Sequence, residues 1–199
     1  MTPQFYLDGV RQALAETDPG PLLAVADALD RAFQDGRSVF TFGNGASAAL
    51  ASHMATDIGK LTSLDLGTGP IVSGVKRLSI MSLNDNAAWM TALGNDIAYK
   101  DVFLEQLKNH LRPRDVVLAI SGSGGSPNVL RALDYARALG ATTLGFTGRQ
   151  AKAGEMLERC DICVQAPATM MEQIEDLHVV YHHIVTRTLY ERVKAAAAA

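Results

Sequence analysis

Several features that would indicate particular classes of protein are missing from this chain of 199 residues. No apolar run is long enough to span a bilayer, and the first residues do not form the basic segment and apolar run of an export signal, so we expect a cytoplasmic protein without membrane contact. The net charge is only −3, which gives no electrostatic footprint for nucleic acid. The 48% of hydrophobic residues is nevertheless typical of one globular domain.

Cysteine is scarce, and the two that are present, Cys160 and Cys163, have C-x-x-C spacing. This spacing can indicate a redox pair or half of a zinc site. A redox pair belongs at a helix N-terminus, whereas these residues lead into the strand-like run "DICVQA". A structural zinc ion would need two further ligands of the same style, and none are spaced for it. We therefore interpret both residues as ordinary thiols at a strand edge.

The apolar pattern predicts an α/β fold. Two segments at the start have helical spacing, 5–16 and 21–36, and strands alternating with helices follow. Alternating strands and helices imply a parallel sheet that is covered on both faces. The expected strands are 38–42, 77–83, 115–120, 141–147 and 162–166, the expected helices are 46–60, 87–94, 99–111, 126–140 and 169–199, and the longest irregular stretch is 62–76.

Two loops that follow expected strands are rich in glycine and serine: "GNGAS" at 43–47 and "SGSGGS" at 121–126. In open parallel sheets, ligands bind at the carboxyl ends of the strands. Both loops lead into helices, whose free N–H groups and dipole favour an anion. Ser126 could simply cap the next helix, but capping needs one hydroxyl and this loop offers three. The pattern therefore predicts a phosphate site.

The first loop also fits a competing motif. "GNGASA" matches G-x-G-x-x-A, the dinucleotide fingerprint, and Asp65 follows at about the spacing of the acidic residue that binds the ribose. A dinucleotide site has no use for a second, serine-rich loop, and the run before Asp65 is a weak strand candidate. We rank this alternative below the phosphate site and expect no nucleotide cofactor.

Two of the expected helices carry groups suited to metal binding or proton transfer. His53 and Asp57 are four residues apart and share a helix face. In the last helix, Glu175 and His183 lie near one face, whereas His182 is rotated by about 100° from His183, so we expect only one of these adjacent histidines to point into a given site. If the helices meet, the groups could form a metal site or an acid/base pair. The plainer alternative for an i,i+4 His/Asp pair is a helix surface.

The segments "FGNGASAALASHMATDIG", "ISGSGGSPNVLRAL", "GFTGR" and "IEDLHVVYHHIV" together resemble the phosphoheptose isomerases of the sugar isomerase (SIS) fold. The resemblance runs from about residue 5 to 192 and includes "GNDIAYKDVF". It implies a single SIS domain over 1–199, with N-terminal helices in 1–36 and an α/β core in 37–199. The implied core is a three-layer sandwich with a five-stranded parallel sheet and a long C-terminal helix. It also implies a homotetramer or dimer with active sites at subunit interfaces.

The resemblance further implies an aldose–ketose isomerase that converts sedoheptulose 7-phosphate to a heptose 7-phosphate. Serines of the second loop, with help from the first, would hold the phosphate, and "LNDNAAW" would border the sugar. Gly122 stands where the family usually has threonine, so one hydroxyl is missing. The implied substrate-binding residues are Asn44, Gly45, Ser47, Asn84, Asp85, Ser121, Gly122, Ser123, Ser126 and Glu175.

In some members of that family, four groups at matching positions bind zinc, and here they are His53, Asp57, Glu175 and His183. Asp57 is one methylene shorter than the family's glutamate, and Glu175 is charged where the family has glutamine. Both keep oxygen ligands, so zinc or another divalent metal is expected, and the extra negative charge should favour it.

For catalysis, we expect proton transfer through an enediol, with Asp57 as the base and His183 as the acid that assists ring opening. A zinc ion that polarises the carbonyl is the alternative, and it competes for Asp57.

A different class of function is a non-catalytic module. Some relatives of the fold have lost the catalytic groups and act as sugar-phosphate sensors or through protein contacts, for example with the replication initiator. The presence of the four groups favours an enzyme, and no segment is left over for a helix-turn-helix motif.

Overall fold

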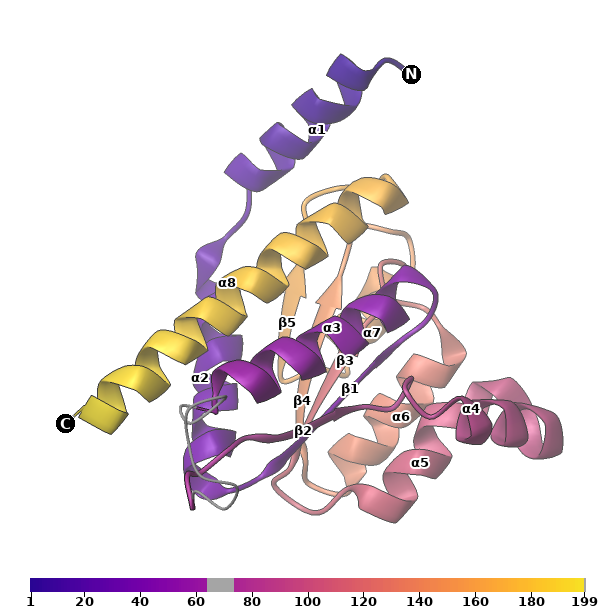
Figure 1. Cartoon of the computed structure of the whole chain (residues 1–199). Coiled ribbons are helices and arrows are strands. Elements are labelled where there is room, and N and C mark those ends of the chain that lie inside the picture. Colours follow the sequence, from indigo (N-terminus) through magenta and orange to yellow (C-terminus); the bar gives the residue numbers. More distant parts are fainter. Residues whose placement is uncertain (64–73, 199) are drawn as a thin grey trace.

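The computed structural model describes residues 1–63 and 74–198 and contains one sheet of parallel strands in the order β2-β1-β3-β4-β5. Helices cover both faces of the sheet, so the chain forms the three-layer sandwich that the sequence predicted (Figure 1). The strands are β1 (Ser38–Gly43), β2 (Ser79–Ser82), β3 (Val116–Ile120), β4 (Thr142–Thr147) and β5 (Ile162–Gln165).

Two hydrophobic clusters fill the spaces between the layers. Along β1, the side chain of Val39 belongs to one cluster, and those of Phe40 and Phe42 belong to the other. Because successive side chains of a strand point to opposite faces, a central parallel strand is apolar on both. The helices that pack on the first face are α2 (Pro19–Asp35), α3 (Ala46–Leu61) and α8 (Met171–Ala198), and those on the second are α5 (Val102–His110), α6 (Pro127–Ala138) and α7 (Ala153–Leu157).

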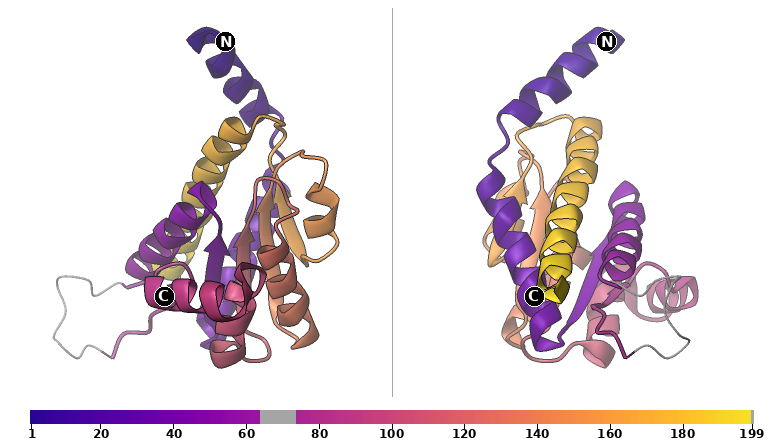
Figure 2. Two further views of the ribbon diagram at one scale, coloured as in Figure 1. Left: turned by 90° about the vertical axis from the view of Figure 1, so that its right-hand side faces the viewer. Right: turned by 60° about the vertical axis from the view of Figure 1, so that its left-hand side comes forward.

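Helix α1 (Pro3–Ala15) projects beyond the sheet, beside the start of α8 (Figure 2). Its N-cap is Thr2, whose Oγ1 accepts a hydrogen bond from the Phe5 amide at 3.2 Å. Only Ala13 of α1 is buried. The helix contacts α8 through, among others, a hydrogen bond of 2.6 Å that the Tyr6 hydroxyl donates to Asp176. This helix therefore contributes little to the core of its own chain.

The element boundaries differ from the predicted ones in a few places. Helix α2 begins two residues early, at Pro19, because Asp18 caps it by accepting a 2.9 Å hydrogen bond from Gly20. After α4 (Ala87–Leu93), a π-helical turn (Gly94–Ala98) joins the two expected helices, and a 3-10 turn (Tyr99–Asp101) replaces the first three residues of the expected helix 99–111. Helix α7 was not predicted, because five residues are too few to show a period.

Asp65 and most of the irregular stretch 62–76 lie outside the described residues. Among the helices that the structure describes, none is long and apolar enough to cross a membrane.

Candidate active site

The two glycine- and serine-rich loops lie side by side. Strands β1 and β3 pair in parallel, with Gly43 opposite Ile120, so both loops leave the same edge of the sheet. Gly45 begins α3 with φ +57°, a conformation that favours glycine, and makes no side-chain cap. The N-termini of α3 and α6 therefore both begin at this edge, as the phosphate-site prediction requires.

Three hydroxyl groups of the second loop gather around one point. The Oγ atom of Ser121 lies 3.4 Å from those of both Ser123 and Ser126. Ser126 is the N-cap residue of α6, yet its side chain makes no capping hydrogen bond. Helix capping therefore does not account for this serine, and its hydroxyl stays with the other two.

A cavity of about 210 Å³ opens onto these hydroxyls. It brings together seven of the ten residues that the family resemblance implied for substrate binding, and it leaves out Gly45, Asn84 and Asp85. Two further lining residues, Ile120 and Met171, were not predicted. Its lining residues are Asn44, Ser47, Ile120, Ser121, Gly122, Ser123, Ser126, Met171 and Glu175.

Asn44 is held by a residue that the sequence analysis missed. The side-chain amides of Asn44 and Asn128 exchange two hydrogen bonds of 2.9 Å, and the Tyr99 hydroxyl donates to Asn44 at 3.0 Å. Asn128 is only 2% exposed. A polar residue that follows Ser-Pro at a helix start is the signal that could have found it, because a buried amide needs partners.

Asn84 and Asp85, which were expected to border the sugar, have separate surroundings. The Asn84 amide accepts from Gly43 N at 3.1 Å and donates to Gly43 O at 3.0 Å, so it holds the first loop against β2. Asp85 accepts a hydrogen bond from the Ser52 hydroxyl and lines a different cavity of about 710 Å³, together with Trp89. Neither residue lines the serine cavity.

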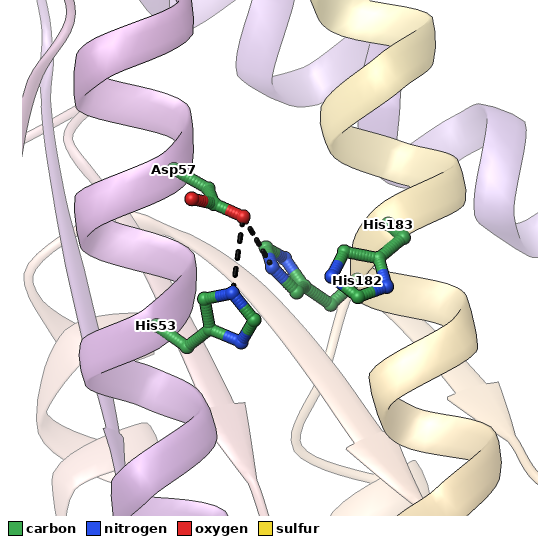
Figure 3. A group of neighbouring side chains, drawn as sticks. All are labelled: His53, Asp57, His182 and His183. Atoms are coloured by element: carbon green, nitrogen blue, oxygen red, sulfur yellow. Dashed lines mark hydrogen bonds and ion pairs between the residues drawn. The ribbon is translucent and has the colours of Figure 1, made fainter.

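Four ionisable side chains from α3 and α8 converge further along these helices (Figure 3). One Asp57 oxygen, Oδ2, lies 3.1 Å from His53 Nε2 and 3.3 Å from His182 Nε2. The His183 ring centre is 5.4 Å from that of His53 and 4.7 Å from that of His182. One potential ligand atom from each of the four residues lies within 4.8 Å of the others. We call these four residues the His/Asp cluster.

The cluster brings together three of the four predicted metal ligands, and His182 joins them. The expectation that only one of the adjacent histidines would face the site is wrong. The cluster lies in the space between α3 and α8. His182 and His183 leave α8 about 100° apart, and both reach this space from different sides. Glu175 is not part of the cluster and lies instead at the serine cavity.

Burial and charge set the protonation of the cluster. Burial lowers the pKa of His182 to about 4, and the neighbouring His53 and His183 act in the same direction. Burial alone would raise the pKa of Asp57, but the hydrogen bond from Lys60 and the nearby His53 outweigh it, so that this pKa is lowered. At neutral pH the cluster therefore holds a carboxylate next to an uncharged His182 imidazole.

The donor set of the cluster fits a divalent metal. Imidazole nitrogen and carboxylate oxygen are the ligands that zinc takes in proteins, besides thiolate. The Nδ1 atom of His182 lies 3.1 Å from the Thr186 hydroxyl, on the far side of the ring from Asp57. A second hydrogen bond of this kind fixes the ring of a metal-binding histidine.

Comparison with known proteins identifies the class first. The chain belongs to the SIS domain family, whose model matches residues 6–148. Within it, the chain is 36% identical to the phosphoheptose isomerase of Rhodospirillum rubrum over 84% of each chain, and 37% identical to that of Pelobacter propionicus over 88% of this chain and 89% of the relative. The protein is therefore a member of the phosphoheptose isomerases, which are sugar-phosphate isomerases, as its motifs predicted.

A solved structure agrees with this assignment at the level of the fold. A phosphoheptose isomerase from Francisella tularensis superposes with a TM-score of 0.82 at 23% identity, over 96% of this chain and 100% of that one.

Proposed function

We propose that this protein interconverts sedoheptulose 7-phosphate and a heptose 7-phosphate by proton transfer through an enediol. The relatives' names support this substrate, and one structural observation carries the proposal. Helices α3 and α8 contribute residues to both the serine cavity and the His/Asp cluster. Ser47 lies at the cavity and His53 in the cluster, and a step of six positions along α3 separates them by roughly 9 Å.

The two ends of this site have separate tasks. The serine hydroxyls and helix N-termini bind the phosphate, and that remote binding energy orients the sugar chain. At the other end, Asp57 takes a proton from C1 of the open-chain ketose and returns it to C2, while a proton passes from the C1 hydroxyl to the C2 oxygen. His183, which is exposed, donates the proton that opens the sugar ring.

In the alternative mechanism, the cluster holds a zinc ion or another divalent metal, and His53, Asp57 and His183 are among its ligands. Asp57 and His183 then serve as ligands instead of base and acid. When bound, the metal would polarise the carbonyl oxygen of the open-chain sugar.

The test is an assay of the purified protein on sedoheptulose 7-phosphate and on a panel of other ketose phosphates. We expect aldose formation from the seven-carbon substrate. If the protein binds the sugar phosphate but forms no aldose with or without added zinc, it is a sugar-phosphate-binding module and not an isomerase.

We further propose that the chain forms one SIS domain that works as a homotetramer or dimer in the cytoplasm. The oligomer is supported by exposed apolar side chains on the neighbouring helices α1 and α8, which are Phe5, Leu7, Val180 and Ile184.

A further inference from the structure

Two side chains of α8 lie at positions that the family pattern does not predict. Glu175, the expected fourth metal ligand, lies at the serine cavity. His182, for which the family pattern gives no role, lies in the His/Asp cluster. The structure thus exchanges one carboxylate for one imidazole at the cluster.

His182 has the surroundings of a fixed ligand. Its side chain is fully buried, and Nε2 faces Asp57 Oδ2 at 3.3 Å. Its Nδ1 faces the hydroxyl of Thr186, which is one helical turn further on and is itself only 4% exposed. When Nδ1 carries the proton and donates it to Thr186, the lone pair of Nε2 points into the cluster.

Helix geometry separates Glu175 from this point. It precedes His182 by seven residues and His183 by eight, which is roughly 10–12 Å along the axis of α8. It shares its cavity with Ser47, Ser121 and Ser126 instead.

We propose that His182 is the fourth ligand of a divalent metal bound by His53, Asp57 and His183, that Thr186 orients it, and that Glu175 accepts hydrogen bonds from the sugar's hydroxyl groups. This inference rests on the proposed function for the role of Glu175, but not for the metal site. With one carboxylate in place of two, the ligand set leaves a net charge of +1 on a bound zinc ion. That charge suits a site where an oxyanion develops.

The experiment measures zinc alone, on metal-free protein, by calorimetry, and repeats the titration with cobalt to follow its absorption spectrum. His182→Asn should weaken zinc binding by at least about 100-fold and change the cobalt spectrum. Thr186→Val should weaken zinc binding by about 10-fold. Thr186→Ser, which keeps the hydroxyl, should bind zinc as the wild type does. Glu175→Gln should leave zinc binding within about two-fold of the wild type and lower kcat/KM.

Glu172→Gln is the matched control for Glu175→Gln, because Glu172 is an exposed carboxylate in the same helix. Thermal unfolding of each variant separates lost ligation from lost folding. If His182→Asn does not fold, the zinc affinities of Thr186→Val and Thr186→Ser still test whether His182 is a ligand.

Three results would overturn the proposal. If Glu175→Gln rather than His182→Asn weakens zinc binding, the carboxylate is the ligand, from its own or a second subunit. If Glu175→Gln leaves both zinc binding and turnover intact, its substrate role is wrong. If the wild-type protein binds no zinc but isomerises the sugar in a chelator, the metal site fails while the proposed function stands.

Discussion

Asp57 is the residue on which the candidate site depends. Its Oδ2 atom contacts His53 and His182, and its Oδ1 atom lies 3.1 Å from Lys60 Nζ. These neighbours lower its pKa against the opposing effect of burial. It is therefore ionised at neutral pH, which suits both a general base and a metal ligand.

Replacing Asp57 with Asn should lower kcat by about 100- to 10,000-fold, because the amide cannot accept the substrate proton. Binding of the phosphate end should change little, since the serine cavity is separate. Turnover and calorimetric binding of the sugar phosphate measure the two effects. Asp30→Asn, on α2, is the control and should keep both values. Near-normal turnover in the Asp57 variant would show that the base lies elsewhere.

A second prediction concerns His178, a buried histidine outside the cluster. Burial lowers its pKa to about 4, although a contact of 3.1 Å between Nε2 and the Thr147 carbonyl opposes the shift. The unfolded chain therefore binds more protons than the folded one between about pH 6.5 and pH 4. Stability should be fully present above pH 6.5 and fall by roughly 3 kcal/mol as the pH drops to 4.

Urea unfolding of the wild type and of His178→Gln across this range tests that prediction. The variant should lose the part of the pH dependence that comes from His178, because glutamine does not titrate. The part that comes from His182, whose pKa is lowered to about 4 as well, should remain. Equal slopes in the two proteins would assign the acid sensitivity to other groups.

At the scale of the elements, the start of α6 separates binding from folding. Ser126 occupies the N-cap position without capping, whereas Asp18 does cap α2. Ser126→Ala should leave the free energy of unfolding within about 0.5 kcal/mol of the wild type and weaken sugar-phosphate binding by about 10- to 100-fold, the loss of one hydrogen bond to a charged group.

Asp18→Ala should do the opposite, with a cost of about 1 kcal/mol in stability and unchanged binding. Chemical unfolding and calorimetry measure both variants. Equal binding losses in the two would contradict the assignment of the Ser126 hydroxyl to the phosphate.

The missing hydroxyl at position 122 has a local explanation. A Cβ atom on Gly122 would lie 2.5 Å from Met171 Sδ, at the start of α8. The Met171 side chain thus occupies the room that a threonine side chain would need, and a threonine at this position would require it to move aside.

The elements could be predicted because their signals are local. Apolar periods mark the helices, with Pro21 near the start and Gly36 at the end of α2, and the buried runs before Gly43 and Ser121 mark the central strands. The grouping of the two loops at one edge of the sheet could be predicted because the carboxyl ends of adjacent parallel strands lie at the same edge. The partners of Asn84, Asn128 and Glu175 could not be predicted, because they depend on how α8 and the loops pack and not on spacing within one segment.

At the scale of the whole molecule, α1 exposes more apolar surface than an isolated chain would favour. Phe5 is 61% exposed and Leu7 is 55% exposed on a helix that projects from the sheet (Figure 2). Exposed apolar patches of this kind mark protein–protein contacts. They support the proposed oligomer.

The double substitution Phe5→Glu and Leu7→Glu should shift the protein to a smaller assembly, because charged side chains cannot be buried unpaired between subunits. Light scattering after size-exclusion chromatography measures the mass. Gln12→Glu, an exposed change on the same helix, should leave it unaltered. An unchanged mass in the double variant would exclude α1 from the interface.

The sharing of α3 and α8 by both ends of the site also bears on substrate size. In the proposed function, α3 and α8 fix the distance between the serine cavity and Asp57, and this distance sets the length of the sugar that fits between them. A ketose phosphate two carbons shorter, anchored by its phosphoryl group, would leave its carbonyl short of the carboxylate. The choice among sugars would then depend on the distance along α3 and α8 between the two ends of the site, and not on any single contact with the sugar.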